Sequence, residues 1–335
     1  MYKIRFPKFS LRTLIIATSL LGIAFAVIGN HYRHAFHQKT AVAWVLENQG
    51  TVTYRYQENE PCVTGKPDSP QWMRNVFGED IFVRVVSINL ENSNVADLSP
   101  LSHVKKLRWL NLKGSRASEL SPLSGLINLE GIDLSDTQID DLSPLQELHK
   151  LGSITANNTE TTILLPISRL TNLTYLKLDH THIKDLSSLG SVANLRLLHL
   201  NHTQVSDLSP LSKLVKIDDL ELMETDVADL STLINFQNLS KLNLEGTRVI
   251  DLSPLAELDY LRQINISKTE VTDISPLKSH IGILEISLKD TPITDISILS
   301  QLIHLEKVDL TGTNIPREEI EKLKIALPKC QILGP

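Results

Sequence analysis

The sequence predicts an α/β solenoid, in which a curved parallel β-sheet of about 12 short strands is joined by short 3₁₀ or α return segments. The first observation is a period: the pentapeptide DLSPL and its variants begin 22 residues, or a multiple of 22, apart from Asp97 to Asp295. Such a fixed period indicates stacked units, each too small to bury its own apolar face. The second observation is the pattern L-x-x-L-x-L in each unit, whose alternation is typical of a short strand with one face inward.

The unit LSKLNLEGTRVIDLSPLAELDY, which begins at Leu239, shows how one repeat is built. Apolar residues occupy unit positions 1, 4 and 6 in the strand, and positions 11, 14, 17 and 20 after it. Ser253 and Pro254 favour the start of a return segment, because serine is a good helix N-cap and proline fits the first helical turn. Leucines three residues apart then predict a tight 3₁₀ or short α turn that faces the sheet.

Two polar columns follow the strands. Position 9 is threonine in nine of the ten units after the first, with Ser115 as the exception. We expect these hydroxyls to bond backbone groups where the chain leaves the strand. The acid at position 13 is interpreted as a capping and solvation feature, not as a row of catalytic acids. The unit from Leu151 departs from the pattern at Ala156 and Ile163, which we interpret as drift rather than a bend or a partner site.

The repeats set the domain organisation. The predicted segments are a basic cytoplasmic tail (1–12), a transmembrane signal-anchor helix (13–32), a linker with a small α/β cap (33–84), leucine-rich units of 22 residues (85–315), and a carboxyl-terminal cap with a helix and a last strand (316–335). The last strand is expected to start at Leu327 and to place Cys330 at a core position as a small buried hydrophobe.

The amino terminus favours export. Thr13 to Tyr32 are 20 consecutive uncharged residues behind a flank with four basic residues, which is long enough to cross a bilayer and places the amino terminus in the cytoplasm. The repeats would then be extracytoplasmic, in the periplasm or at the cell surface. The alternative is a signal peptide cleaved after Ala26, since Ala24-Phe25-Ala26 fits a small-x-small site. Both interpretations export the repeats.

The segment between anchor and repeats is expected to close the open end of the stack. Its predicted elements are a helix over 40–48 ending before Gly50 as a left-handed cap, a strand over 51–56, a loop over 58–70, a short helix over 71–77 and the first repeat strand over 81–90.

The consensus L-x-x-L-x-L-x-x-T-x-V/I-x-D-L-S-P-L-x-x-L resembles the 22-residue leucine-rich repeat of bacterial internalin-like proteins, from Val85 to the carboxyl end. Threonine stands where that family commonly has asparagine. The layout, with FSLRTLIIATSLL, then WVLENQGTVTYRY, then repeats, also resembles membrane-anchored bacterial repeat proteins. The resemblance implies a curved parallel sheet and a single-pass anchor, and it implies no activity.

Composition and motifs exclude several functions. Residues 1–40 hold six basic residues and no acid, so the rest carries 27 basic and 39 acidic residues, a net charge of −12. Such a body repels nucleic acid, and no nucleic acid partner is expected. Cys62 and Cys330 would lie far apart in a solenoid, so no disulfide is expected between them. The sequence has no Gly-rich phosphate loop, G-x-S-x-G, H-E-x-x-H or Cys-x-x-Cys motif, and we predict no enzyme and no cofactor.

Function is expected on the concave face, where unit positions 2, 3, 5 and 7 point away from the core. Aromatic and arginine side chains beside apolar area are typical of protein interfaces. The alternative is an ordinary solvated sheet face with scattered large residues. The candidate ligand-binding residues are Trp109, Tyr175, Lys177, Arg196, Leu197, His199, Asp219, Glu221 and Met223.

The sequence therefore predicts a membrane-tethered, exported recognition module that binds a protein, a peptide or an envelope polysaccharide. One alternative is a structural envelope spacer without a specific ligand. A remote alternative is a metal-dependent enzyme, because His180, His202 and Glu224 share position 8 of successive units, with Asp179 and His182 close by, and these residue types bind zinc. Position 8 lies on a turn, and we predict no metal there.

Overall fold

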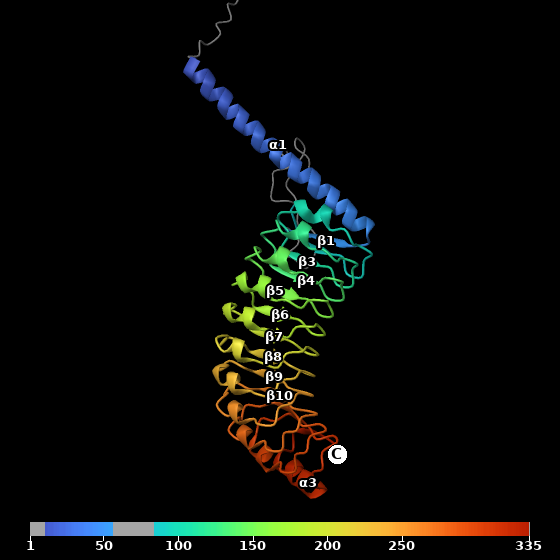
Figure 1. Ribbon diagram of the computed structural model, residues 1–335, viewed down its shortest axis with the longest axis vertical. Helices are drawn as coiled ribbons and strands as arrows, with labels where there is room; N and C mark the ends of the chain where they lie inside the picture. The colour runs from blue at the N-terminus through green and yellow to red at the C-terminus, as the bar shows by residue number, and fades with distance from the viewer. Residues whose placement is uncertain (1–10, 56–83, 335) are drawn as a thin grey trace, which may run out of the picture.

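The computed structural model describes residues 11–55 and 84–334 and shows one gently curved stack of strands (Figure 1). Thirteen strands form a single sheet in sequence order. The first, β1 (Thr51–Tyr54), is antiparallel to β2 (Val85–Asn89), and all later neighbours are parallel. The solenoid prediction is confirmed. The loop expected over 58–70 and the helix expected over 71–77 lie outside the described residues.

Ten strands of three residues form the middle of the sheet. They are β3 (Trp109–Asn111), β4 (Gly131–Asp133), β5 (Ser153–Thr155), β6 (Tyr175–Lys177), β7 (Leu197–His199), β8 (Asp219–Glu221), β9 (Lys241–Asn243), β10 (Gln263–Asn265), β11 (Glu285–Ser287) and β12 (Lys307–Asp309). Each pairs with the next at an offset of 22 residues, so equal unit positions lie side by side.

Short 3₁₀ turns return the chain along the other side of the stack. They are η3 (Ser99–His103), η4 (Ser121–Leu123), η5 (Ser143–Leu145), η6 (Leu165–Arg169), η7 (Ser187–Ser191), η8 (Ser209–Leu211), η9 (Ser231–Asn235), η10 (Ser253–Leu255), η11 (Ser275–Leu277) and η12 (Ser297–Gln301).

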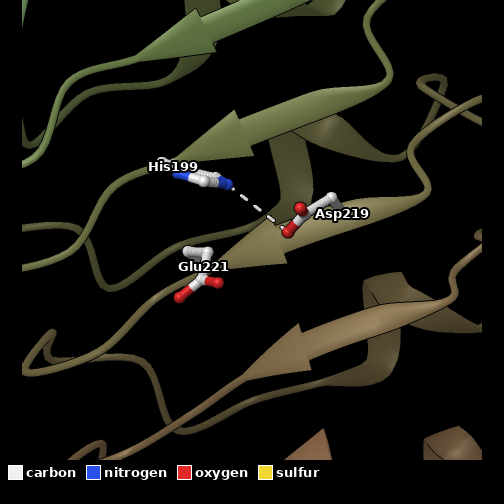
Figure 2. A group of neighbouring side chains, drawn as sticks. All are labelled: His199, Asp219 and Glu221. Atoms are coloured by element: carbon white, nitrogen blue, oxygen red, sulfur yellow. Dashed lines mark ion pairs between the residues drawn. The ribbon is translucent and has the colours of Figure 1, made fainter. Parts of the chain in front are cut away.

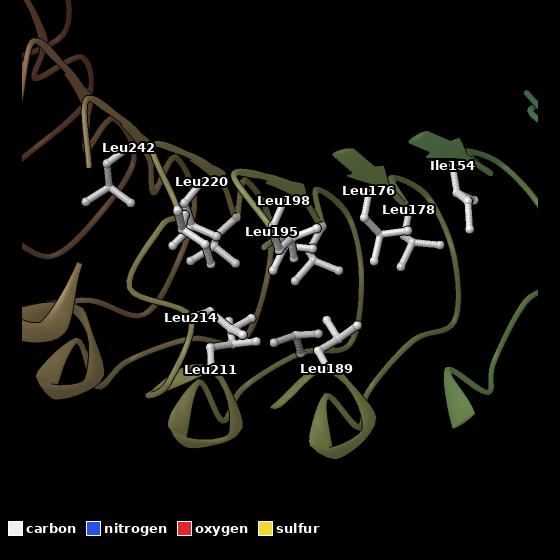
Figure 3. Close-up of a cluster of buried hydrophobic side chains, with 14 of the residues drawn as sticks. Ile154, Leu176, Leu178, Leu189, Leu195, Leu198, Leu211, Leu214, Leu220 and Leu242 are labelled. Carbon is white, nitrogen blue, oxygen red and sulfur yellow. The ribbon is translucent and has the colours of Figure 1, made fainter. Parts of the chain in front are cut away.

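The core lies between the sheet and these turns. Strand leucines such as Leu198 and Leu220 face turn leucines such as Leu189 and Leu211, and all four are fully buried (Figure 3). Burying one leucine stabilises a fold by about 1.5–3 kcal/mol. Because every unit supplies the same set, the core runs the length of the stack. In the unit from Leu151, Ala156 is fully buried in place of a leucine, whereas Ile163 is exposed.

The corner before each turn is capped by aspartate. In η10, Ser253 N–H donates to Asp251 Oδ1 at 2.8 Å and Ser253 Oγ donates to Asp251 Oδ2 at 2.7 Å. The prediction that serine is the N-cap is wrong, because Leu252 holds that place and Ser253 is already in the turn. The aspartate two residues earlier does the capping, as expected for position 13. The same backbone bond forms at eight corners.

The threonine column at position 9 behaves as predicted. Its hydroxyl donates to the backbone carbonyl three residues earlier, for example from Thr181 to Leu178 at 2.7 Å and from Thr225 to Leu222 at 2.7 Å. These side chains are buried, so the bond satisfies both groups at the bend.

The amino-terminal helix α1 (Leu11–Glu47) is one continuous helix of 37 residues, where a transmembrane helix and a separate second helix were expected. Residues 33–39 contain neither glycine nor proline, so nothing interrupts the backbone between the two predicted segments. The far half of α1 packs on the first strands: Ala41 and Val45 are buried. Gln38 Oε1 accepts from Val85 N–H at 3.1 Å.

The end of α1 differs from the predicted cap. Gln49, not Gly50, takes the left-handed backbone conformation, with φ of 62°. Gly50 is needed for a different reason. A Cβ there would lie 2.7 Å from the Asn89 carbonyl oxygen and 2.8 Å from Val45. The chain therefore passes too close to its neighbours for a side chain.

The carboxyl end closes with α3 (Arg317–Ala326) and β13 (Gln331–Leu333). Gln331 pairs with Lys307, an offset of 24 residues, because the helix uses two more residues than a 3₁₀ turn. Ile332, not Cys330, therefore pairs with Val308 of the core. The prediction of Cys330 as a small buried hydrophobe at a core position is wrong, since the residue is half-buried at the edge of the core. Burial raises the pKa of its thiol above the ordinary value.

Candidate ligand-binding face

Position 5 of most units does a structural task on the concave face. Its asparagine or aspartate accepts a hydrogen bond from the backbone N–H of position 7 in the same unit, a local bond typical of these residues. The acceptors are Asn89, Asn111, Asp133, Asn243, Asn265 and Asp309, at 2.9 to 3.1 Å.

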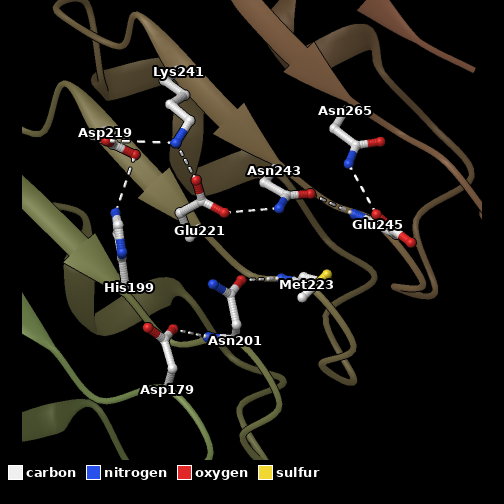
Figure 4. A network of polar contacts seen from close by, with 10 residues as sticks. All are labelled: Asp179, His199, Asn201, Asp219, Glu221, Met223, Lys241, Asn243, Glu245 and Asn265. Carbon is white, nitrogen blue, oxygen red and sulfur yellow. Dashed lines mark hydrogen bonds and ion pairs between the residues drawn. The ribbon is translucent and has the colours of Figure 1, made fainter. Parts of the chain in front are cut away.

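In the units of β6, β7 and β8, the backbone N–H of position 7 has a different acceptor. There the position 7 N–H donates to the position 7 side chain of the preceding unit (Figure 4). Asp179 N–H bonds Asn157 at 2.9 Å, Asn201 N–H bonds Asp179 at 2.9 Å and Met223 N–H bonds Asn201 at 2.7 Å. Position 5 of these three units, Lys177, His199 and Glu221, is thereby freed from supporting the backbone.

Three acidic and imidazole side chains gather on β7 and β8 (Figure 2). His199 Nε2 lies 3.4 Å from Asp219 Oδ1, and their side chains are 12% and 22% exposed. Glu221 is 10% exposed and accepts from Asn243 Nδ2 at 2.7 Å. Lys241 of β9 forms an ion pair with Glu221 and lies 3.9 Å from Asp219.

Burial of the Lys241 ammonium opposes its charge, but the contact with Glu221 and the charge of Asp219 outweigh this and raise the pKa of Lys241 above the ordinary value. The carboxylates of this cluster are therefore held by an internal cation. Asp219 and Glu221, two of the predicted ligand-binding residues, thus share one cation on the concave face.

Two large aromatic side chains are exposed on the concave face. Trp109 is 45% exposed and Tyr175 is 47% exposed. Trp109 lies over Gly131 of the next strand, where a Cβ would come within 2.1 Å of the indole ring. Ser153 separates Gly131 from Tyr175 in the strand register. Two rings thus flank a floor of small residues.

The remaining predicted residues continue this surface. Leu197 is half-buried between Tyr175 and Asp219 in register, and Lys177 neighbours His199. Met223 is half-buried and takes part in the position 7 ladder. The structure brings the predicted residues of β6, β7 and β8 together, whereas Trp109 lies on β3.

A groove of about 810 Å³ opens beside the starts of β7 to β10. Arg196 pairs with Asp218 in its wall. Lys216, Lys241 and Arg262 also line it, and among the described residues no carboxylate lies within ion-pair distance of Lys216 or Arg262. A second groove of about 390 Å³ runs along β8 to β12. The first groove offers cationic groups that are not already neutralised.

The residues that sequence reasoning missed are Lys241, Asn201 and Asn243. A signal for Lys241 existed, because it stands at position 3 directly beside Asp219 in the register and carries the opposite charge. The position 7 ladder also had a signal: asparagine and aspartate are absent from position 5 where they appear in succession at position 7.

The histidines at position 8 do not form the metal group that was considered. His180 and His202 stack with ring centroids 4.2 Å apart, and both have left-handed backbones with φ of 56° and 55°. Across residues 11–55 and 84–334, the one set that brings three or more possible ligand atoms within 4.8 Å of one another is His199, Asp219 and Glu221.

The parallel sheet, the 3₁₀ returns and the 22-residue period define a leucine-rich repeat solenoid. The fold is similar to that of an internalin, InlF, from Listeria monocytogenes, with 24% identity, a TM-score of 0.63, and coverage of 78% of this chain and 86% of that one. It is also similar to the functional domain of InlJ from Listeria monocytogenes, with 15% identity, a TM-score of 0.57, and coverage of 75% and 62%.

A further similar structure is the leucine-rich repeat ectodomain of a plant membrane receptor kinase from Arabidopsis thaliana, solved in complex with CASPARIAN STRIP INTEGRITY FACTOR 2. Its identity is 16%, its TM-score is 0.63, and the match covers 88% of this chain and 44% of that one. No protein-family model and no curated protein matches the sequence.

Proposed function

We propose that this protein is an exported, membrane-tethered recognition module that binds a protein or peptide on its concave face. The observation that carries the proposal is the release of position 5 in β6, β7 and β8. In six other units that column supports the backbone, while here the ladder of Asn157, Asp179 and Asn201 supplies the support. Because the position 5 side chains of these units do not bond the backbone, their identity can be set by the needs of binding.

The exposed side chains favour a partner with an apolar segment. Trp109 and Tyr175 offer rigid aromatic area at low entropic cost, and such residues carry much of the binding energy in protein interfaces. The cations Lys216 and Arg262 beside the groove favour an acidic group nearby on the same partner. The plant receptor ectodomain, which has the same kind of fold, was solved with a bound factor; this supports binding as the general role.

The amino-terminal half of α1 supports tethering. The helix is long and apolar enough to cross a membrane. Its large apolar side chains from Leu11 to Val27 are more than half exposed to solvent wherever they are described. A bilayer would cover this surface, and the basic flank before it favours a cytoplasmic amino terminus.

The test is capture of a partner from solubilised source-cell envelopes by the full chain in detergent. We expect Trp109→Ala with Tyr175→Ala to reduce the captured partner at least tenfold, because each ring supplies on the order of 2 kcal/mol as an interface anchor. The control is Ile127→Ala with Ile303→Ala, two side chains that are 61% and 67% exposed but precede the strands.

Capture that survives loss of both rings would place recognition elsewhere. Capture by none of the three chains would favour the spacer alternative. Protease treatment of the envelopes before capture separates a protein or peptide, which it removes, from a polysaccharide, which it leaves.

A further inference from the structure

The cluster of His199, Asp219 and Glu221 has the composition and placement of a cation site. His199 and Glu221 are register partners on β7 and β8, and Asp219 precedes Glu221 by two residues on the same face. One ligand atom from each lies within 4.8 Å of the other two (Figure 2). An imidazole and two carboxylates are ligands that zinc accepts.

Two polar atoms in this cluster lack a hydrogen-bond partner. His199 Nε2 and Asp219 Oδ1 are both buried, and neither makes a hydrogen bond although they face each other at 3.4 Å. Buried polar atoms in folded proteins are nearly always satisfied, so each exception calls for an explanation. Both are atoms that bind metal ions.

The charges of the cluster also favour a bound cation. Two carboxylates, those of Asp219 and Glu221, face a single ammonium, that of Lys241. A divalent cation in place of the ammonium would balance the carboxylates and would satisfy both unpaired atoms. Lys241 is 42% exposed and has a long flexible side chain, so it can withdraw into solvent.

We propose that His199, Asp219 and Glu221 bind a divalent transition-metal cation of the zinc type, and that Lys241 holds the two carboxylates when no cation is bound. Three protein ligands leave a coordination position open toward the concave face. The lysine competes with the ion, so its removal strengthens binding. This inference stands independently of the proposed recognition of a partner.

The experiment is titration of the chelator-treated full chain in detergent with zinc chloride at pH 7.5, followed by calorimetry and by equilibrium dialysis with metal analysis. We expect one zinc ion per chain. Lys241→Met should tighten binding at least tenfold because it removes the competing ammonium. His199→Ala should weaken binding at least tenfold because it removes the nitrogen ligand.

The matched control is His180→Ala with His202→Ala. It removes the stacked histidine pair at unit position 8, outside the proposed site, and should leave the affinity unchanged. Circular dichroism of the metal-free variants reports folding, and His199→Gln replaces His199→Ala if the latter does not fold. Absence of zinc binding in both the parent and Lys241→Met would overturn the proposal. So would binding that the control abolishes and His199→Ala retains.

Discussion

At the scale of single residues, the concave face divides into side chains that hold the backbone and side chains that do not. Asn111 and Asn243 bond the N–H two residues ahead, and their loss would leave a backbone donor without a partner. His199 and Glu221 have no such duty because Asp179 and Asn201 stand in for them. The backbone of these three adjacent units is therefore supported without the position 5 side chain.

This exchange of tasks predicts a measurable coupling between two residues. Asp179→Ala should destabilise the chain by about 1 kcal/mol, because Asn201 N–H loses its acceptor. His199→Asn in the same chain should recover most of that loss, since asparagine at position 5 accepts this N–H in other units. Urea unfolding of the parent, both single variants and the double variant gives the coupling energy. Simply additive effects would contradict the exchange.

The sequence predicted which residues face the concave side, but not which of them would bind one another. Alternation along a strand settles the face of Asp219 and Glu221. It does not say that Lys241, one strand away, extends its side chain to both. That choice depends on the lengths of side chains on neighbouring strands and on the charge they bury together, which appear only when the register is known.

At the scale of elements, eight of the ten described 3₁₀ turns begin from an aspartate that accepts the backbone N–H of the serine two residues ahead. The bonds to serine lower the pKa of six of these carboxyls below the ordinary value of 3.8: Asp97, Asp141, Asp185, Asp207, Asp251 and Asp295. The charged form is therefore preferred in the folded state.

A pH dependence of stability follows. Because the folded pKa values lie below the unfolded ones, the capping contribution is complete above the ordinary value near 3.8 and is lost as the pH falls through the lowered values. We expect the urea midpoint to be steady above pH 5 and to fall steeply below pH 4. Asp207→Asn should lower the midpoint at pH 7 and make the acid decline shallower.

The matched control is Asp140→Asn. Asp140 adjoins a corner, and its side chain makes no hydrogen bond to any described residue, so this change should leave the profile unaltered. An equal effect of both variants would mean that general charge, not the caps, governs acid stability.

Element boundaries were predicted well where the 22-residue period acts and poorly where it ends. The ten inner strands and their turns follow from spacing alone, because each unit must match its neighbours. The continuity of α1 and the shift of two residues before β13 were not predicted. Both depend on helix length, and the two ends of the chain lie outside the repeats, so no neighbouring unit indicates that length.

At the scale of the whole molecule, the helix α1 lies at one end of the solenoid (Figure 1). The amino-terminal half of α1 exposes its apolar side chains, whereas the leucines of the repeats are buried. We expect the full chain to stay with membranes after alkaline carbonate extraction. A chain without residues 1–32 should be released, because the apolar run is gone and the remaining part of α1 is held to the solenoid by buried Ala41 and Val45. Mass spectrometry of the membrane-bound form should find residues before Ala26. A mass that starts after Ala26 would show that the helix is a cleaved signal instead.

The continuity of α1 has a mechanical consequence. A helix of 37 residues is about 55 Å long, and the proposed bilayer span would take about 30 Å of it. The rest is clamped to the first strands by Gln38, Ala41 and Val45 with no flexible joint between. In the proposed membrane-tethered arrangement, the sheet would move rigidly with the anchor: a pull on its far end would tilt the helix in the lipid, and the concave face would keep one orientation toward the membrane surface.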